Sequence, residues 1–169
     1  MNKWGQQIQI LQGKFGEKLE KIHLPQHYPT EVPILIVKKE AVLELLSFLK
    51  KEDGFEYDFL ADMTAIDETP REPRFDIVYN LFSTARFWRI RVKCPVNEEM
   101  PTAISVWAGA NWAEREIYDM FGIRFLGHPD LRRILLDVRW EGYPLRKDYP
   151  LRGYQVFSTP ESIDPELLK

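Results

Sequence analysis

The chain has 169 residues, of which 44% are hydrophobic and 13% aromatic, enough for one domain with a sizeable core. Its 23 basic and 26 acidic residues nearly cancel, which argues against binding of nucleic acid or a membrane surface by the whole molecule. The single cysteine, Cys94, can form neither an internal disulfide nor a four-thiolate cluster or zinc knuckle, so we expect it to be a small buried residue.

The sequence also bears on location. Residues 1–6 contain no apolar core of a secretory signal and are too poor in Arg and Ser for a transit peptide, so we expect the chain to stay in the cytoplasm. The longest strongly apolar run, residues 32–37, is far shorter than the roughly 20 residues that cross a bilayer. Any membrane attachment should therefore go through a partner.

The first third of the chain predicts two helices around one strand. Apolar side chains recur every three or four residues over 4–22, which predicts a helix, although two glycines weaken it. Prolines then mark a loop, and Ile34–Val37 is typical of a short buried strand. Residues 38–51 predict an amphipathic helix that ends near Gly54.

Three strands are predicted next, over 57–63, 75–82 and 87–93, from their β-branched and aromatic residues. In the last one apolar residues alternate with three basic ones, so one face should pack inward and the other should carry positive charge. Residues 83–86 are few enough to close a hairpin between the second and third strands.

Helical spacing returns in a short piece, 104–107, and then over 112–121. Asn111 and Glu114 have the spacing of a capping box, in which each side chain binds a backbone amide of the first turn. Gly122 is expected to end this helix.

One arc of this helix is polar apart from a tryptophan, and lies opposite Ala113, Ile117 and Phe121. Its members are Trp112, Arg115, Glu116 and Asp119. Paired carboxylates can act as catalytic acids and bases or relay protons. We prefer a structural interpretation, in which Arg115 and Asp119 form an i,i+4 ion pair and the arc makes charge-assisted contacts with the C-terminal segment or a partner.

Residues 126–169, here called the strap, contain five prolines and no sustained apolar period. They are nevertheless too apolar for a disordered segment. The apolar residues are Leu131, Ile134, Leu135, Leu136, Val138, Trp140, Tyr143, Leu145, Tyr149, Leu151, Tyr154, Val156 and Phe157. We interpret the strap as an ordered, extended segment whose apolar groups another chain buries. From Arg124 to Arg152 there are seven basic and four acidic residues, which favours an acidic partner surface.

The predicted fold class is therefore α+β. Residues 1–125 should form a two-layer α/β sandwich with a small, mostly antiparallel sheet, and the extended strap should follow it from residue 126 to residue 169.

A resemblance to a known family enters at residues 111–135, which read NWAEREIYDMFGIRFLGHPDLRRIL. The order of Glu-Arg-Glu, an acid three residues on, two apolar residues, a histidine, a basic residue and an aliphatic pair resembles the signature of the 30-kDa (C) subunit of respiratory-chain NADH dehydrogenase. Residues 142–150, GYPLRKDYP, also resemble the segment that follows in that family. The signature and interface residues are Trp112, Glu114, Arg115, Glu116, Asp119, Phe121, Gly122, His128, Asp130, Arg132, Arg133, Pro144, Arg146, Lys147 and Asp148.

The resemblance implies a subunit of a proton-translocating NADH:quinone oxidoreductase that has no catalytic residues, metal or cofactor of its own. FMN, iron–sulfur clusters and quinone would bind to other subunits. The implied partners are the 49-kDa-type (D) quinone-site subunit and the adjacent cluster-bearing B- and I-type subunits. The implied location is the cytoplasmic side of the bacterial inner membrane, reached through the complex without direct insertion.

Several other interpretations of single motifs are weaker. The tripeptide His128-Pro129-Asp130 could be a metal or catalytic site or a J-domain loop, but a turn accounts for it. The spacing of His23 and His27 is that of a zinc helix, yet the intervening Pro25 excludes a helix there. No glycine-rich phosphate loop is present in the sequence, so NADH or ATP should not bind by that device.

The basic residues of the strap could grip nucleic acid, but interleaved acids favour a protein interface. Two other functions remain open. The chain could be the equivalent subunit of a plastoquinone-reducing complex, a membrane-bound hydrogenase or a methanogen-type dehydrogenase, or it could be a free-standing protein-binding domain.

Overall fold

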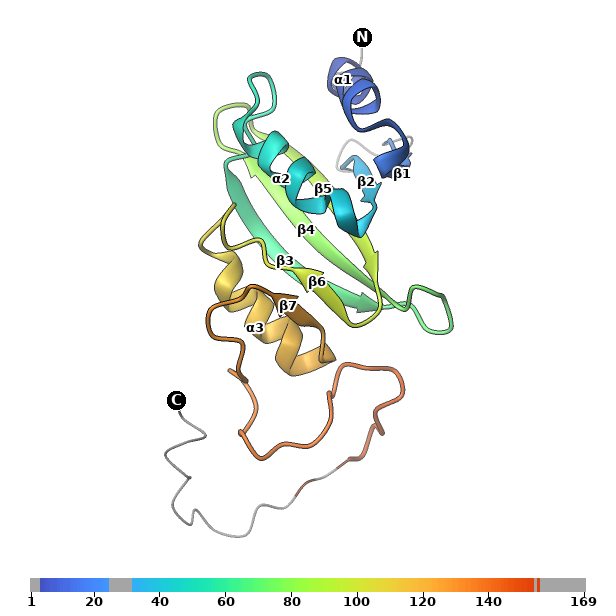
Figure 1. Cartoon of the computed structure of the whole chain (residues 1–169), viewed down its shortest axis with the longest axis vertical. Coiled ribbons are helices and arrows are strands. Elements are labelled where there is room, and N and C mark those ends of the chain that lie inside the picture. The colour runs from blue at the N-terminus through green and yellow to red at the C-terminus, as the bar shows by residue number, and fades with distance from the viewer. Residues whose placement is uncertain (1–3, 25–31, 154, 156–169) are drawn as a thin grey trace.

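The computed structural model describes residues 4–24, 32–153 and 155, and it has an α+β fold (Figure 1). Its elements in chain order are α1 (Gly5–Phe15), β1 (Leu19–His23), β2 (Ile34–Val37), α2 (Val42–Lys51), β3 (Phe59–Asp67), β4 (Phe75–Ser83), β5 (Trp88–Val96), β6 (Glu99–Pro101), α3 (Ala110–Phe121) and β7 (Arg124–Leu126). Short 3-10 turns, Gly16–Lys18 and Lys39–Ala41, precede β1 and α2.

The main sheet has the strand order β1-β2-β5-β4-β3. Its neighbours pair antiparallel except β2 and β5, which are parallel, so the predicted small and mostly antiparallel sheet is confirmed. β6 and β7 form a separate parallel pair. The predicted hairpin between β4 and β5 is also confirmed.

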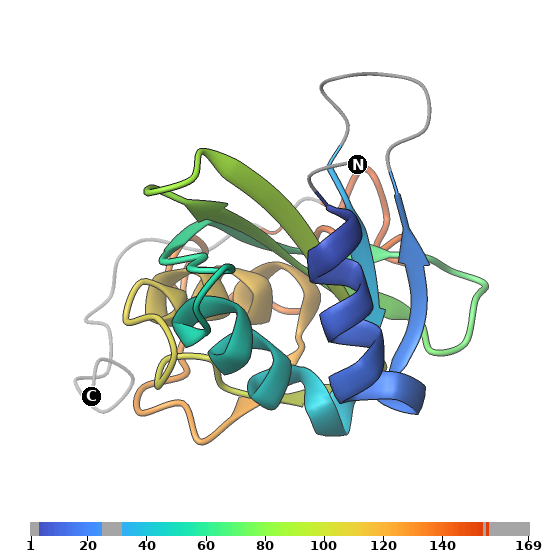
Figure 2. The ribbon, with the colours of Figure 1, turned by 90° about the horizontal axis from the view of Figure 1, so that it is seen from above.

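One face of the main sheet carries the core. The strand register places Leu35, Val92, Tyr79 and Met63 in one row across four strands, and all four are buried. The helices that the structure describes lie on this face, as Figure 2 shows from above. Cys94 belongs to the same face and is fully buried, as expected, and this burial raises the pKa of its thiol to about 12.

Helices α1 and α2 cover one half of that face. The buried side of α2 holds five apolar residues, Val42, Leu45, Leu46, Phe48 and Leu49. Beside it, α1 buries Gln7, whose amide donates to the Gly54 carbonyl at 2.6 Å and accepts the Tyr57 hydroxyl at 3.0 Å. The one polar residue that α1 buries is therefore hydrogen-bonded, as a buried amide needs to be.

The predicted helix over residues 4–22 is wrong beyond Phe15. Gly16 has a φ of +43°, which ends the helix, and residues 19–23 form β1 instead. Leu19 and Ile22 continue the helical spacing in the sequence, yet they pack against the core from a strand that pairs with β2. Strand pairing here outweighs the local periodicity.

Three further expectations are corrected. The predicted strand over 57–63 is displaced, since β3 starts at Phe59 and runs to Asp67. Residues 104–107 form turns rather than helix. The expected capping box is absent, because α3 is capped at Gly109 and starts at Ala110, which places Asn111 inside the helix. The predicted division after residue 125 stays a prediction, and β7 continues one residue past it.

Candidate partner-binding site

Helix α3 and the described part of the strap form the site that the signature residues mark. In Figure 1 the strap leaves β7 and runs along and below α3. The inner side of α3 packs on the sheet, where the rings of Phe121 and Phe75 meet edge to face at 6.2 Å. The outer side of α3 holds the strap, so this helix lies between the sheet and the strap.

Asp119 anchors the strap from the middle of this surface. Its Oδ2 accepts the backbone N–H groups of Ile134, Leu135 and Leu136 at 3.0, 2.8 and 2.9 Å. Its Oδ1 accepts Nη1 of Arg133 at 2.6 Å, and the side chain is fully buried. Burial raises the pKa of this carboxyl, but the amide and guanidinium hydrogen bonds outweigh burial and hold the pKa below its usual value.

Arg115 holds the same stretch of the strap from one turn earlier. Its Nε donates to the carbonyl of Arg132 and its Nη2 to the carbonyl of Arg133, both at 3.1 Å. The guanidinium also lies over the Trp112 ring at 5.4 Å and 4.0 Å from Asp130. Together with the carboxylate of Asp119, it fixes the backbone of residues 132–136.

The predicted i,i+4 ion pair between Arg115 and Asp119 is therefore wrong. Both side chains point to the strap and use its backbone and Arg133 as partners. Arg133 also donates to the Gly142 carbonyl at 3.0 Å and lies over the Tyr143 ring at 5.3 Å. An exposed ion pair on the surface of a helix stabilises it little. Asp119 instead accepts hydrogen bonds from Arg133 and from three backbone amides of the strap.

His128 lies in the turn that starts the strap. Its backbone N–H donates to the Phe125 carbonyl at 3.2 Å, and Asp130 donates its backbone N–H to Nδ1 of the ring at 3.0 Å. Nδ1 is thus an acceptor, so the proton resides on Nε2, which faces the Asn111 carbonyl at 3.2 Å. Both ring nitrogens are therefore hydrogen-bonded, and the ring joins the turn at the start of the strap to Asn111 in the first turn of α3.

Glu114 lies on the buried side of α3 and is not exposed to solvent. Its carboxyl accepts the Thr102 hydroxyl and the Ala103 backbone N–H, both at 2.6 Å, and so ties α3 to the segment after β6. Burial raises the pKa of Glu114 to about 7, although these two hydrogen bonds lower it. The sequence pattern predicted that Glu114 would accept the backbone amide at the helix cap. In the structure it accepts the backbone amide of Ala103 instead.

Gly122 ends α3, as expected, in the left-handed region at φ +75°. A Cβ at this position would lie 2.5 Å from the Tyr143 ring and 2.7 Å from Nη2 of Arg146. Arg146 in turn donates to the Phe121 carbonyl, and its guanidinium lies over Tyr143 at 4.6 Å. The absent side chain therefore makes room for the strap to close over the end of the helix.

The strap reaches the sheet at Lys147 and Asp148. The backbone N–H of Lys147 donates to Asp67 at 2.8 Å. Arg74 bridges Asp67 and Asp148, with two hydrogen bonds to each carboxylate. The guanidinium of Arg74 holds the pKa of Asp67 well below its usual range, while burial acts in the opposite direction. Neither Asp67 nor Arg74 was identified from the sequence, because they lie 80 and 74 residues from their strap partners Lys147 and Asp148.

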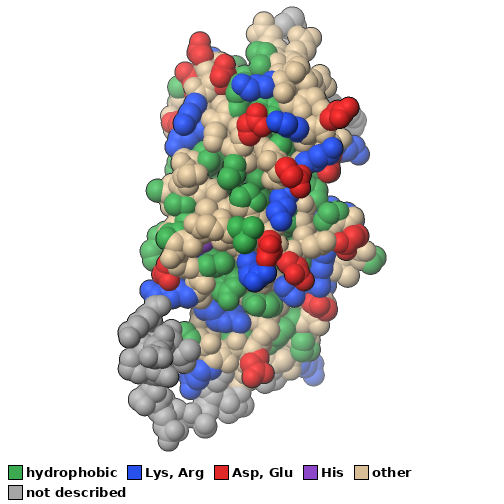
Figure 3. Space-filling model, viewed as in Figure 1, with side chains coloured by type: hydrophobic (Ala, Val, Ile, Leu, Met, Phe, Trp, Pro, Cys, Tyr) green, Lys and Arg blue, Asp and Glu red, His purple; other side chains and the backbone are tan. Residues whose placement is uncertain are grey.

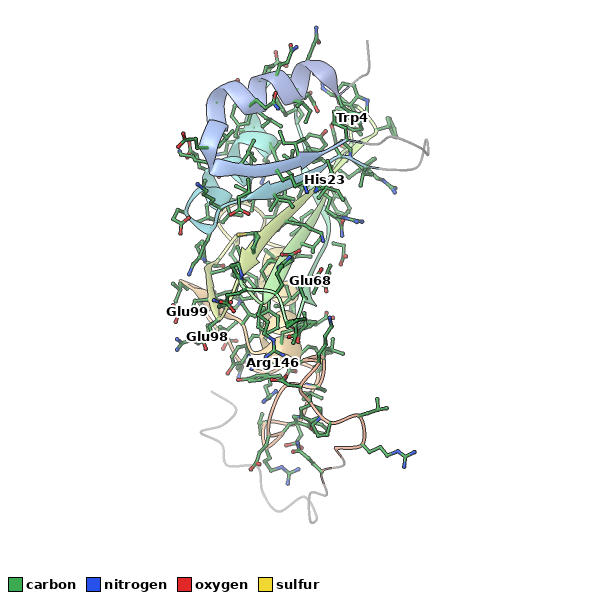
Figure 4. All side chains as sticks on the ribbon, turned by 90° about the vertical axis from the view of Figure 1, so that its right-hand side faces the viewer. Trp4, His23, Glu68, Glu98, Glu99 and Arg146 are labelled. Carbon is green, nitrogen blue, oxygen red and sulfur yellow. The ribbon has the colours of Figure 1, made fainter. Side chains whose placement is uncertain are left out.

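Beside this junction lies a hollow of about 900 Å³. Figure 4 labels three of its lining residues, Glu98, Glu99 and Arg146, at the end of the sheet nearest the strap. Both signs of charge line it, and Glu99 is paired with Arg124. We assign the hollow no ligand.

The outer surface of α3 and the strap exposes large apolar side chains. Trp112 and Leu135 are each 63% exposed, Leu145 is 54% exposed and Leu151 is fully exposed. Trp112 and Leu135 line a groove of about 440 Å³ between β3, α3 and the strap. The other apolar residues that line it are Leu60, Ala61, Met63, Ala113 and Ile134. Glu116, also a lining residue, is exposed at its edge.

The signature residues therefore fall into two groups. Those that fold the strap onto the domain are Glu114, Arg115, Asp119, Phe121, Gly122, His128, Arg133, Arg146, Lys147 and Asp148. The others are exposed or half-buried: Trp112, Glu116, Asp130, Arg132 and Pro144. The contact expected between the polar arc of α3 and the strap is present, whereas the contacts that join the strap to Asp67 and Arg74 were not predicted. The expectation that another chain covers its apolar groups stays a prediction, and residues 156–169 lie outside the described part.

The surface is mixed in charge. Figure 3 shows acidic and basic side chains interspersed with hydrophobic ones over the face seen in Figure 1. Across residues 4–24, 32–153 and 155, no group of three or more His, Cys, Asp or Glu is placed to hold a metal ion. No helix in these same ranges has the length and apolar character of a membrane span. Of the two candidate zinc histidines, His23 lies on β1, and His27 lies outside the described residues.

Comparison with known proteins identifies the family. The family of the respiratory-chain NADH dehydrogenase 30-kDa subunit matches residues 35–155 of this chain. The chain belongs to this family. The match confirms the resemblance carried by residues 111–135, and it extends from β2 through the strap contacts described above.

Two bacterial relatives illustrate the similarity. A C-type subunit of the NADH-quinone oxidoreductase of Rhizobium meliloti is 46% identical over 146 residues, which cover 85% of this chain and 78% of that protein. The C-type subunit of the NADH-quinone oxidoreductase of Citrifermentans bemidjiense is 50% identical over 129 residues, or 75% of this chain and 78% of that protein.

A solved structure shares the fold of this 30-kDa-family chain. One chain of the membrane-bound sulfane sulfur reductase, an archaeal respiratory membrane complex, superposes with a TM-score of 0.70. The aligned region covers 88% of this chain and 86% of that chain, at 24% identity. At this level of identity the likeness shows the fold alone.

Proposed function

We propose that this chain is a cofactor-free structural subunit in the peripheral arm of a proton-translocating NADH:quinone oxidoreductase. Its family membership supports this directly. In this proposal electrons pass from NADH through FMN and iron–sulfur clusters in other subunits to quinone. The chain itself fixes the positions of those subunits and is needed for assembly, on the cytoplasmic side of the bacterial inner membrane.

One observation carries the proposal: the strap is anchored to α3, yet it leaves apolar side chains in solvent. Trp112 and Leu135 are exposed beside each other on the groove, while Asp119 and Arg115 form their hydrogen bonds with the backbone beneath. Exposed aromatic and aliphatic groups on a rigid, preordered surface are what a stable interface uses for its core. The surface is therefore suited to a permanent partner.

The proposed partners are the 49-kDa-type (D) quinone-site subunit and the neighbouring cluster-bearing B- and I-type subunits. The excess of seven basic over four acidic residues from Arg124 to Arg152 favours a partner surface with carboxylates. Three of these arginines, Arg132, Arg133 and Arg139, are already paired with carboxylates of this chain. A permanent assembly of this kind should bury more than about 2,000 Å². Acidic residues interleaved with the arginines argue against nucleic acid as the partner.

We propose no catalytic role for the two buried carboxylates of α3. Asp119 is saturated by four donors, and Glu114 is enclosed and bound by Thr102 and Ala103. A general acid or base must reach the reacting group of a substrate. Neither carboxyl can do so unless the helix leaves its place.

Purification of the tagged chain from detergent-solubilised membranes tests the proposal. Mass spectrometry should recover the quinone-site and cluster-bearing subunits, and the purified material should contain FMN and iron. Recovery of the chain without any of those subunits would refute the respiratory assignment and favour a free-standing binding domain.

A second candidate is the equivalent subunit of a related complex, such as a plastoquinone-reducing complex or a membrane-bound hydrogenase. The shared fold with a chain of the sulfane sulfur reductase complex favours a scaffold common to several such machines. The same purification separates the two. A co-purifying flavoprotein that oxidises NADH supports the first candidate, and its absence from an otherwise intact complex supports the second.

A further inference from the structure

The main sheet has a second face, opposite the helices, that the described residues leave open (Figure 2). We call it the outer face. The strand register sets its members in four rows: Arg89, Phe82, Phe59; then His23, Ile34, Arg91, Asn80, Asp62; then Lys21, Ile36, Lys93, Val78, Thr64; then Pro95, Asp76, Ile66. Figure 4 shows His23 near the end of the sheet where β1 and β2 lie.

The outer face is more apolar than an open face should be. Antiparallel sheets with one wet face normally alternate apolar and polar residues. Here β2 is apolar on both sides, with Leu35 and Val37 in the core and Ile34 and Ile36 half-buried on the outer face. A strand that is apolar on both sides is typical of a sheet covered on both faces.

Exposed aromatic rings gather at one end of this face. Phe59 and Phe82 are paired across β3 and β4, and Phe59 is 54% exposed. Phe87, at the tip of the β4–β5 hairpin, is 80% exposed, and its ring meets that of Phe82 at 6.1 Å. Ile66, at the opposite end of β3, is also exposed. Apolar groups that gather on one surface mark interaction sites in soluble proteins.

Two arginines lie among these apolar groups and form no ion pair with a carboxylate in residues 4–24, 32–153 or 155. Arg89 lies over the Phe82 ring at 5.6 Å, and Arg91 donates to the Asn80 side-chain oxygen at 2.8 Å. Neither has an ion pair with any described residue. Asp76, on the same face, is already bound by Arg71 and Lys93. The face therefore offers two guanidinium groups for a carboxylate supplied from outside.

We propose that the outer face is a second docking surface, beyond the groove of α3 and the strap that it meets at Asp62 and Thr64, for a segment of another subunit that carries carboxylates between apolar side chains. The carboxylates bind Arg89 and Arg91, and the apolar side chains cover Ile34, Ile36 and the exposed phenylalanines. The proposal rests on the proposed function only in that the partner belongs to the same assembly. A polyanion such as RNA fits less well, because Asp62 and Asp76 share the face.

Cysteine labelling in the assembled complex tests where the partner lies. Arg89→Cys and Lys21→Cys place thiols on the outer face, and Lys51→Cys places one at the exposed end of α2 as a matched control. The native Cys94 is fully buried and gives a low background. We expect a maleimide to label the two outer-face thiols at least 10-fold more slowly in the complex than in the isolated chain, with Lys51→Cys unchanged.

Equal labelling of Arg89→Cys and Lys21→Cys in the two states would overturn the proposal. So would protection that is already present in the isolated chain, because the cover would then be this chain's own residues. If Trp112→Cys is protected in the same complex while the outer face is not, the proposed function stands and the second surface fails. If the chain enters no complex, the proposed function fails first.

Charge reversal tests the chemistry of the partner. The double variant Arg89→Glu/Arg91→Glu should lower the amount of chain recovered in the complex at least 10-fold, whereas Arg89→Lys/Arg91→Lys should keep most of it. Lys51→Glu is the control for charge alone. Normal recovery of the Glu double variant would overturn the acidic partner, since two new carboxylates would then face it without effect.

Discussion

Replacing Asp119 by alanine should release the strap from α3. The variant removes the acceptor of three backbone N–H groups, those of Ile134, Leu135 and Leu136, and leaves the guanidinium of Arg133 without its carboxylate. Hydrogen bonds to a charged group are worth about 1.5–3 kcal/mol each, and they are not additive. The loss of one partner of a buried ion pair costs about 3–5 kcal/mol, which sets the scale for the whole site.

The expected loss is local, because the strap can open while the sheet stays folded. A cost of about 3–5 kcal/mol raises the opening equilibrium by roughly 100- to 1,000-fold or more, at 1.4 kcal/mol for each factor of ten. Hydrogen–deuterium exchange of the full-length chain measures this directly. The amides of residues 134–136 should exchange at least about 100-fold faster in Asp119→Ala, while those of β4 and β5 should be unchanged.

Two controls sharpen the Asp119 experiment. Asp119→Asn keeps an oxygen acceptor but loses the charge, so its effect should lie between wild type and alanine. Asp137→Ala removes a strap carboxylate whose partner is the neighbouring Arg139 and should leave the three amides protected. If Asp119→Ala leaves exchange at residues 134–136 unchanged, the carboxylate does not anchor the strap and the account of this site is wrong.

Two more predictions concern α3. Glu114 has a pKa of about 7 in the folded chain against 4.5 unfolded, so the folded state binds the extra proton and loses stability as pH rises through this interval. Between pH 5 and 8 this decline in the free energy of unfolding is on the order of 3 kcal/mol, and Glu114→Gln should remove it in chemical denaturation. An unchanged pH dependence in the variant would show that Glu114 stays ionised. Gly122→Ala should cost more than about 1 kcal/mol and speed exchange of the Leu145 amide, which donates to the Met120 carbonyl, because the new Cβ displaces Tyr143. Gly54→Ala, at a similar positive φ with nothing within 4 Å, should carry the backbone cost alone, and equal losses in the two variants would contradict the strap contact.

The sequence predicted most elements of the domain because their patterns are local. The stripe of α2 and the alternation of β5 follow from apolar periodicity, and Gly122 was identified from its place after a helical run. β1 was missed because Leu19 and Ile22 continue the spacing of α1, and pairing with a distant strand decided their conformation. Periodicity alone cannot show such a pairing.

The site was predicted as a set of residues but not as a geometry. Arg115 and Asp119 were singled out correctly as members of one polar arc, yet their partners lie 14 to 18 residues further on, in a segment without regular structure. Arg74 and Asp67 carried no motif at all. Their roles depend on where the strap meets the sheet, which is a property of the folded chain.

The most direct test of the account compares assembly with turnover in the double variant Trp112→Ala/Leu135→Ala. Both side chains are 63% exposed, so the isolated chain should keep its stability, whereas loss of two interface anchors at about 2 kcal/mol or more each should deplete the assembled complex. Ile10→Ala, at 50% exposure on α1, is the control for an exposed apolar residue elsewhere. We expect less complex, with normal NADH:quinone turnover per complex. A normal amount of complex with lost turnover would contradict a structural role for this chain.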